Sequence, residues 1–481
     1  MLQLIDIVFI VFYFAVTIFL SALASTRIKN YSDFIVAGRR LTAPLLAGSL
    51  VATYYGLDVT FGSPETSYLE GVSTFFIYSA PFYLSYLLIV FLIAKRVRDA
   101  SVDSLPEYFE TRFGAGVRLP VALATSLYSL PVLSVFGFGL LGSHFLGIDP
   151  LASMLIGAGF AALYAAAGGL LADTYSDLFQ FLVMCVSVAV ISAVALTSVG
   201  TPNEWSSIDP SMLVPTGGLS NADIIVYGAV ALTPLVDPGI YQRIFAAKSV
   251  KAIRIGLLAS TAIWAAFDWL VVYIGLVAIH LVGTGEIASD LDPARVMLEL
   301  AAYFLPAGLL GLFIAGAIGT AMSTIDSYAI VSSMTAVKEA DRLGGKRSSD
   351  TALLWRTRIG IFVVTLVAII IAARFERIRD AWIVMASILA SGLLVPMLAS
   401  LMPAKNLASF GKAAAWGGIL SAGALLVLFE LIGVYDADYG TRRLTFAGLS
   451  LIREHIVFVG IPSSFICGLV AVAIGSKHRV P

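Results

Sequence analysis

The stretch AGAIGTAMSTIDS, residues 315–327, decides the fold and lies inside an apolar segment of residues 307–336. Its first half consists mostly of small residues, which allow neighbouring helices to approach closely in lipid. In its second half Thr320, Ser323, Thr324 and Ser327 recur at the i, i+3, i+4, i+7 spacing, so their hydroxyls share one helical face. This pattern predicts a membrane helix with a polar stripe that faces other helices.

Asp326 lies at the edge of that stripe. An ionisable group inside a membrane span costs about 2.5–3.5 kcal/mol, so it faces the bundle interior or water and usually serves a function. Hydroxyls beside a carboxylate offer the oxygen ligands that suit a small hard cation. The alternative is that the hydroxyls only bond their own backbone or join two helices.

The rest of the chain has the composition of a membrane protein. Of its 481 residues 59% are hydrophobic and 13% charged, and the mean hydropathy is +0.93. We expect an all-α polytopic membrane protein with about thirteen transmembrane helices, forming a single transporter domain over residues 1–481. In this interpretation the span at 4–24 is peripheral and uncleaved, the core covers about 43–402, and two further spans occupy 413–475.

The distribution of Lys and Arg predicts the orientation. With the N-terminus outside and the C-terminus in the cytoplasm, the basic clusters at 95–118, 243–254 and 338–358 all fall inside. The sequence contains no ATP-binding loop, nucleophile elbow or zinc-protease motif, so we expect no enzyme activity, and any transport must draw on an ion gradient.

Two of the predicted spans are interrupted. ATYYGLDVTFGSP, residues 52–64, and LTPLVDPG, residues 232–239, both contain proline, glycine and an aspartate. Proline breaks or kinks a helix, and the freed backbone groups are tolerated at membrane depth only where they line a cavity. The interrupted spans are five apart, which favours an inverted repeat around a central binding site. Ordinary Pro/Gly kinks are the alternative. In the sixth span Asp173 is read as a cap, whereas Asp177 lies one turn deeper.

Four segments, in this order, resemble the sodium/solute symporter family, which includes the sodium/proline, sodium/galactose and sodium/sialic acid carriers. They are FIVAGRRL at 34–41 with SLVA at 49–52, GGL at 168–170 with SDLFQ at 176–180, QRIFAAKS at 242–249, and MSTIDS at 322–327. The resemblance implies a LeuT-type five-plus-five inverted-repeat core, alternating access and Na⁺ as the coupling ion.

The same resemblance implies the site residues. A sodium site would use the carbonyls of Ala52, Tyr55 and Thr320 and the hydroxyls of Ser323 and Thr324. A second cation site would use Asp177, Ser323, Asp326 and Ser327, although a carboxylate at Asp326 equally favours a proton. The solute pocket departs from the sugar and proline carriers, and its candidate residues are Tyr54, Asp58, Thr60, Thr233 and Asp237.

The leading hypothesis is therefore a sodium-coupled secondary active symporter of the plasma membrane that imports a small organic solute, amino-acid-like or hydroxylated. Two acids in the pocket suit an amine-bearing or hydroxyl-rich solute and resist an unpaired anion. The alternatives are a proton-coupled carrier of the same fold and a transporter-like membrane sensor that acts with a separate partner. The expected partners are the solute, the ion and the lipid bilayer, with no nucleic acid.

Overall fold

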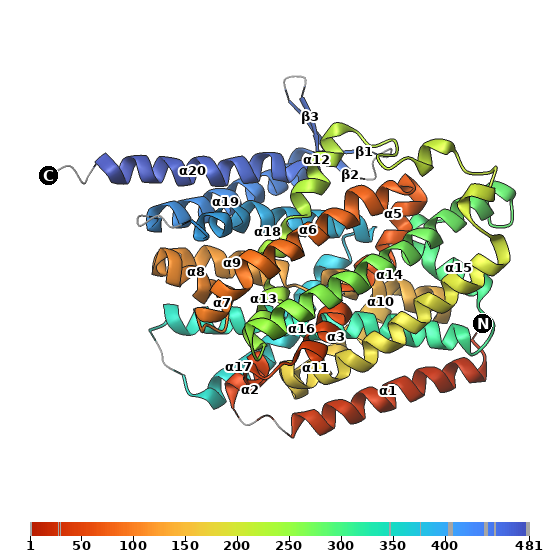
Figure 1. Ribbon diagram of the computed structural model, residues 1–481, viewed down its shortest axis with the longest axis horizontal. Helices are drawn as coiled ribbons and strands as arrows, with labels where there is room; N and C mark the ends of the chain where they lie inside the picture. The colour runs from red at the N-terminus through yellow and green to blue at the C-terminus, as the bar shows by residue number, and fades with distance from the viewer. Residues whose placement is uncertain are drawn as a thin grey trace.

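The computed structural model describes residues 2–26, 28, 30–345, 348–375, 377–402, 407–436, 441–446 and 449–477. Figure 1 shows long helices that run along the long axis of the molecule. Eleven helical stretches of the described chain are long and apolar enough to cross a membrane. One of them contains a helix of 50 residues with a kink, and the interrupted second span is not among them. The predicted all-α membrane fold is thus confirmed, whereas the count of about thirteen spans and the domain bounds stay predictions.

The helices of the first half are α1 (Leu4–Ser25), α2 (Tyr31–Val36), α3 (Ala43–Tyr54), α4 (Leu57–Thr60), α5 (Gly62–Glu70), α6 (Ala80–Leu88), α7 (Ala94–Asp99), α8 (Leu105–Phe113), α9 (Arg118–Tyr128), α10 (Val132–Leu146) and α11 (Pro150–Val199). Those of the second half are α12 (Asn221–Val230), α13 (Pro238–Ala246), α14 (Val250–Thr284), α15 (Val296–Phe304), α16 (Leu309–Leu343), α17 (Asp350–Ala372), α18 (Ile378–Ser400), α19 (Ala408–Ile432) and α20 (Val457–Lys477). Single π-helical turns on either side join α6 to its neighbours.

A small antiparallel sheet lies between α19 and α20. Its strands β1 (Val434–Asp436), β2 (Thr441–Phe446) and β3 (Leu449–Ile452) follow one another in the order β1-β2-β3. The charge pattern places this segment on the outer side of the membrane and carries no information on strands. Strands this short carry too few residues to show an alternating pattern, so hydropathy alone misses them.

Both predicted interruptions are present. The second span divides into α3, α4 and α5, with Gly56 in an extended conformation between the first two. The seventh span divides into α12, one 3₁₀ turn and α13, which begins at Pro238. Proline suits the first turn of a helix because the amide it lacks has no partner there. Each interruption therefore exposes helix ends in the middle of the bundle, as the sequence predicts.

A glycine forms the turn between the fifth and sixth predicted spans. Gly169 has a φ of 54° inside α11, which divides that helix into two lengths. A Cβ added there would also approach the ring of Phe34 to 2.5 Å. Glycine is thus required both by the backbone conformation and by packing. Two of the segments that carry the family resemblance, around residues 34 and 168, meet at this contact.

The helix that contains the 315–327 stretch, α16, packs against α11, α1, α3, α9 and α17. A Cβ on its Gly316 would approach Ser187 of α11, and one on Gly319 would approach the Tyr13 hydroxyl of α1 to 3.1 Å. The small residues therefore bring neighbouring helices close, as expected. The Asp6 carboxylate of α1 accepts hydrogen bonds of 2.7 and 2.8 Å from the amides of Gly308 and Gly311, at the start of α16.

Candidate functional site

Oxygen atoms converge where the end of α3 meets the middle of α16. The Ser323 hydroxyl lies 2.7 Å from the Ala52 carbonyl and 3.3 Å from the Thr320 carbonyl. The Thr324 hydroxyl lies 3.2 Å from the Thr53 carbonyl and 3.1 Å from the Thr320 carbonyl. All five residues are buried. This set, which we call the α3–α16 oxygen cluster, offers the neutral oxygen ligands that suit a small hard cation.

The structure brings together four of the five residues predicted for the sodium site. The fifth, Tyr55, is the C-cap of α3, and its hydroxyl donates to the Trp264 carbonyl at 3.2 Å and to Asp268 at 2.6 Å. Among the described contacts none joins the Tyr55 carbonyl to the cluster. The Thr53 carbonyl was not predicted. The last four carbonyls of a helix lack intrahelical partners, and this rule applied to α3 would have identified Thr53.

The Thr320 side chain does not belong to the α3–α16 oxygen cluster. Its hydroxyl donates to the Gly316 carbonyl of its own helix at 2.9 Å. Only its backbone carbonyl faces Ser323 and Thr324. That geometry agrees with the expectation that Thr320 contributes a carbonyl.

A second polar group surrounds Arg243 of α13, whose side chain is fully buried. Its guanidinium donates to the Ser49 hydroxyl at 2.9 Å, to the Ser327 hydroxyl at 2.5 Å, and to Thr53. The Asp173 and Asp177 carboxylates each lie 3.6 Å from the same nitrogen, Nη2. Five of these residues come from three other helices, α3, α11 and α16, so Arg243 joins them at the centre of the bundle.

Three of the four residues predicted for a second cation are divided between these two groups, and Asp326 belongs to neither. Asp177 accepts a 2.5 Å hydrogen bond from Ser49, and Ser327 donates to Asp173 at 2.8 Å. Ser323 belongs instead to the α3–α16 oxygen cluster. Neither oxygen of Asp326 has a hydrogen-bond partner in the described part of the chain.

Two sequence-based interpretations need correction here. The charge pattern predicts Arg243 in an inside loop, but it is buried in the bundle. The sequence predicts a cap at Asp173, but its carboxylate accepts from Ser327 and lies beside Arg243. A charge pattern assigns every Lys and Arg to a loop in water, because a charge inside the membrane is costly. The burial of Arg243 is tolerated because acids from another helix pair with it, and the sequence does not show that pairing.

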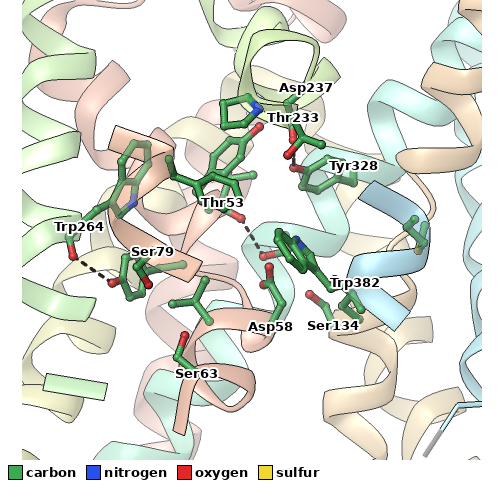
Figure 2. Close-up of a pocket in the computed structure, with 18 of the residues that line it drawn as sticks. Thr53, Asp58, Ser63, Ser79, Ser134, Thr233, Asp237, Trp264, Tyr328 and Trp382 are labelled. Atoms are coloured by element: carbon green, nitrogen blue, oxygen red, sulfur yellow. Dashed lines mark hydrogen bonds between the residues drawn. The ribbon is translucent and has the colours of Figure 1, made fainter. Parts of the chain in front are cut away.

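A cavity of about 120 Å³ opens beside the interruption of the second span. Four of the five predicted solute residues line it: Tyr54, Asp58, Thr233 and Asp237. Thr60 is buried and does not line it. Figure 2 shows Asp58 on one side of the cavity, with Tyr328 and Asp237 on the other.

Most of the cavity wall was not predicted. Its further polar and aromatic residues include Tyr83, Tyr86, Tyr128, Trp264, Asp268, Tyr328 and Trp382, from α6, α9, α14, α16 and α18. These residues are far apart in the sequence and follow no shared periodicity, so only the packing of the helices reveals them.

Asp237 acts as the N-cap of α13. It accepts hydrogen bonds from the Gly239 amide at 2.7 Å and the Ile240 amide at 3.3 Å, and the Tyr328 hydroxyl lies 3.1 Å away. Asp237 therefore caps this half-helix in addition to lining the cavity. The Tyr54 hydroxyl also accepts from the Ile240 amide, at 3.1 Å, so two predicted solute residues hold the start of α13.

Ion pairs connect helices at the end of the bundle that the charge pattern places inside. Arg118 pairs with Glu110 at 2.6 Å and with Glu339, and Lys338 pairs with Glu107 at 3.0 Å. Burial raises the pKa of Glu107, but the nearby Lys338 and the other charges outweigh it, so this pKa lies below its usual range. At neutral pH the carboxylate stays ionised, and the link between α8 and α16 persists.

Three comparisons place this architecture among known proteins. A family model described as the sodium:solute symporter family matches residues 34–420. The chain is 26% identical over 380 residues to the high-affinity proline transporter PutP of Bacillus subtilis (strain 168), covering 73% of this chain and 76% of that protein.

Solved structures show the same fold. A Na⁺-coupled sialic acid symporter is similar with a TM-score of 0.79 at 18% identity, over 98% of both chains. Mhp1, a nucleobase-cation-symport-1 family transporter, is similar with a TM-score of 0.56 at 12% identity, over 92% of this chain and 95% of its own. Both have the LeuT fold, so the predicted LeuT-type core is confirmed.

Proposed function

The chain belongs to the sodium:solute symporter family, and we propose that it imports a small organic solute together with sodium by alternating access. As a family member it is a membrane transporter, not an enzyme, and Na⁺ is its coupling ion. The finer points are our proposal: direction of transport, plasma-membrane location, N-terminus outside with C-terminus in the cytoplasm, and the residues that bind ion and solute.

The α3–α16 oxygen cluster is the observation that carries the proposal. We assign sodium to Ala52, Thr320, Ser323 and Thr324, with Thr53 added and Tyr55 retained from the family pattern. Oxygens at the end of α3 and in the middle of α16 would coordinate a cation there. In alternating access by rigid-body movement these two helices move apart. Sodium therefore stabilises the conformation in which these helices lie together, and it shifts the population toward that conformation.

The position of Gly56 supports coupling between ion and solute. A Cβ at Gly56 would overlap the Asp58 carboxylate and lie 3.1 Å from the Thr324 hydroxyl. Asp58 lines the cavity, and Thr324 belongs to the oxygen cluster. One interruption of the second span thus serves both sites, so a solute that orders α4 also affects the sodium ligands. We assign the solute to Tyr54, Asp58, Thr233 and Asp237.

A second cation near Asp177, Ser323, Asp326 and Ser327 is a separate proposal. Charge supports it: Asp173, Asp177 and Asp326 influence one another electrostatically, whereas only Arg243 brings a positive charge to them among the described residues. An imbalance of this kind favours binding of a cation or a proton.

Uptake into proteoliposomes tests the main proposal. Reconstituted protein is given an inward sodium gradient, an inward proton gradient, or neither, with a panel of radiolabelled solutes that includes proline, sugars and amines. Symport predicts accumulation above equilibrium with the sodium gradient only. Accumulation driven by protons alone would establish the proton-coupled alternative. Sodium-dependent binding without accumulation of any solute would favour the sensor alternative.

A further inference from the structure

The charges on the cavity wall all have one sign. Asp58, Asp237 and Asp268 line the cavity, and its described lining contains no Lys, Arg or His. A solute with a free carboxylate would enter this field without a basic side chain to pair with. Repulsion between that carboxylate and the acids of the wall would weaken binding, whereas attraction between the acids and a cation would strengthen it.

Two of these three acids already have partners that hold them in place. Asp237 caps α13 and contacts Tyr328. Asp268 accepts hydrogen bonds from the hydroxyls of Tyr55 and Tyr83. Both therefore serve to connect helices as well as to line the cavity.

Asp58 differs from the other two acids. It has no ion-pair partner or side-chain hydrogen bond among the described contacts, and its carboxylate lies against the amides of residues 58 and 59 at the start of α4. It also remains partly accessible from the cavity. Asp58 is thus the carboxylate free to pair with a solute.

Aromatic rings form the wall of the cavity that faces α14. The ring centroids of Tyr86 and Trp264 lie 4.5 Å apart, and those of Tyr54 and Trp264 lie 5.8 Å apart. On the α16 side Tyr128 and Tyr328 lie 6.0 Å apart, and Trp382 of α18 completes the enclosure. Aromatic faces attract cations, most strongly where water is excluded.

We propose that the transported solute is a small organic cation, an amine or quaternary ammonium without a carboxylate, whose positive centre binds between Asp58 and these aromatic rings. The proposal rests on the proposed function, because it names the solute class of the same symporter. At the start of α13 the amide donors offer no substitute for a basic residue, since Asp237 and Tyr54 already accept from them.

The competing role for Asp58 is to balance the charge of sodium. Asp58 and Thr324 both lie close to the Cα of Gly56. The negative charge of the Asp58 carboxylate would therefore attract an ion in the α3–α16 oxygen cluster. In that case Asp58 would affect sodium affinity and leave the choice of solute unchanged. The two roles therefore predict different results for one substitution.

The first experiment compares solutes that share a shape and differ in charge. Purified full-length protein in nanodiscs, at saturating sodium, is titrated with choline, its neutral tert-butyl analogue and its carboxylate analogue betaine, and with the smaller pair ethanolamine and glycine. Quenching of tryptophan fluorescence reports binding, since Trp264 and Trp382 line the cavity. We expect choline or ethanolamine to bind. The neutral analogue of choline and the carboxylates betaine and glycine should bind more weakly, by about tenfold or more.

Equal or tighter binding of betaine, glycine or the neutral analogue would overturn the proposal, as would the absence of binding by both cations. These outcomes need no variant, so they hold even if a substitution impairs folding. If a sodium gradient drives uptake of a zwitterion, the proposal of a cationic solute is refuted and the proposal of sodium symport stands. If the cation binds but a sodium gradient does not drive its uptake, the proposal of symport is refuted and the proposal of a cationic solute stands.

The second experiment uses Asp58→Asn, with Asp290→Asn as the matched control because Asp290 is exposed in a loop. We expect Asp58→Asn to weaken cation binding about tenfold or more. Measured without solute, the sodium concentration for half-maximal binding of sodium should change little. If it rises instead while the preference for cation over neutral analogue persists, Asp58 serves sodium and the proposal fails.

Discussion

Removing one hydroxyl from the α3–α16 oxygen cluster should raise the sodium concentration needed for half-maximal uptake. Thr324→Val keeps the shape of the side chain and deletes the oxygen that lies 3.1 Å from the Thr320 carbonyl and 3.2 Å from the Thr53 carbonyl. Ser323→Ala deletes the oxygen that lies 2.7 Å from the Ala52 carbonyl. A polar contact to a charged group contributes about 1.5–3 kcal/mol. Because 1.4 kcal/mol corresponds to a tenfold change, each variant should need about ten to a hundred times more sodium.

The controls come from the same helix. Thr335 also has a buried hydroxyl on α16, eleven residues beyond Thr324, so Thr335→Val tests whether loss of any hydroxyl from this helix has the same effect. Thr320→Val removes a hydroxyl that bonds the Gly316 carbonyl and leaves the Thr320 carbonyl in place. Neither control should change the sodium requirement more than about twofold, a few tenths of a kcal/mol.

The assay is a sodium titration of initial uptake rates in proteoliposomes, with a sodium-dependent thermal shift as a check that each variant folds and binds. Unchanged sodium dependence in both Thr324→Val and Ser323→Ala would refute the assignment of sodium to this cluster. An equal rise in Thr335→Val would show that the effect arises from the helix as a whole.

Three further predictions concern the second cation, the orientation and the stability. If a second cation binds, Asp326→Asn should lower the Hill coefficient for sodium from about two to about one, and normal transport across sodium concentration and pH would make this acid structural. In a background without the native cysteines, Ser206→Cys should react with an impermeant thiol reagent from outside and Ser348→Cys only from inside; the opposite labelling would reverse the orientation. Asp6→Ala should lower the free energy of unfolding by about 1–3 kcal/mol, because two buried amides at the start of α16 lose their acceptor; an unchanged melting temperature would contradict this.

The interruptions of the second and seventh spans could be predicted because proline and glycine act on their own backbone. Pro64 and Pro238 each lie in the first turn of a new helix, and Gly56 allows the close approach of Asp58 and Thr324. The helix starts at Pro64 and Pro238 need no distant residue, whereas the contact of Gly56 with Thr324 depends on α16. The hydroxyl stripe of α16 follows from helical periodicity in the same way.

The stripe did not reveal which oxygens act together. Ser323 and Thr324 face the carbonyls of α3, whereas Ser327, one turn further, faces Asp173 and Arg243. All lie on one face of α16, but the neighbouring helix changes along its length. Helical periodicity predicts which residues share a face of α16, but it does not predict which neighbouring helix each residue contacts.

By itself the sequence determined the membrane fold, the two interruptions and the helical face that carries the proposed sodium ligands, since each follows from hydropathy or from a local backbone preference. Only the tertiary structure decided the burial of Arg243 between Asp173 and Asp177. It also decided that Asp58 faces aromatic residues from α6, α9, α14, α16 and α18. A buried charge is tolerated, and a cavity acquires its chemistry, through side chains that lie far apart in the chain and meet only when the helices pack.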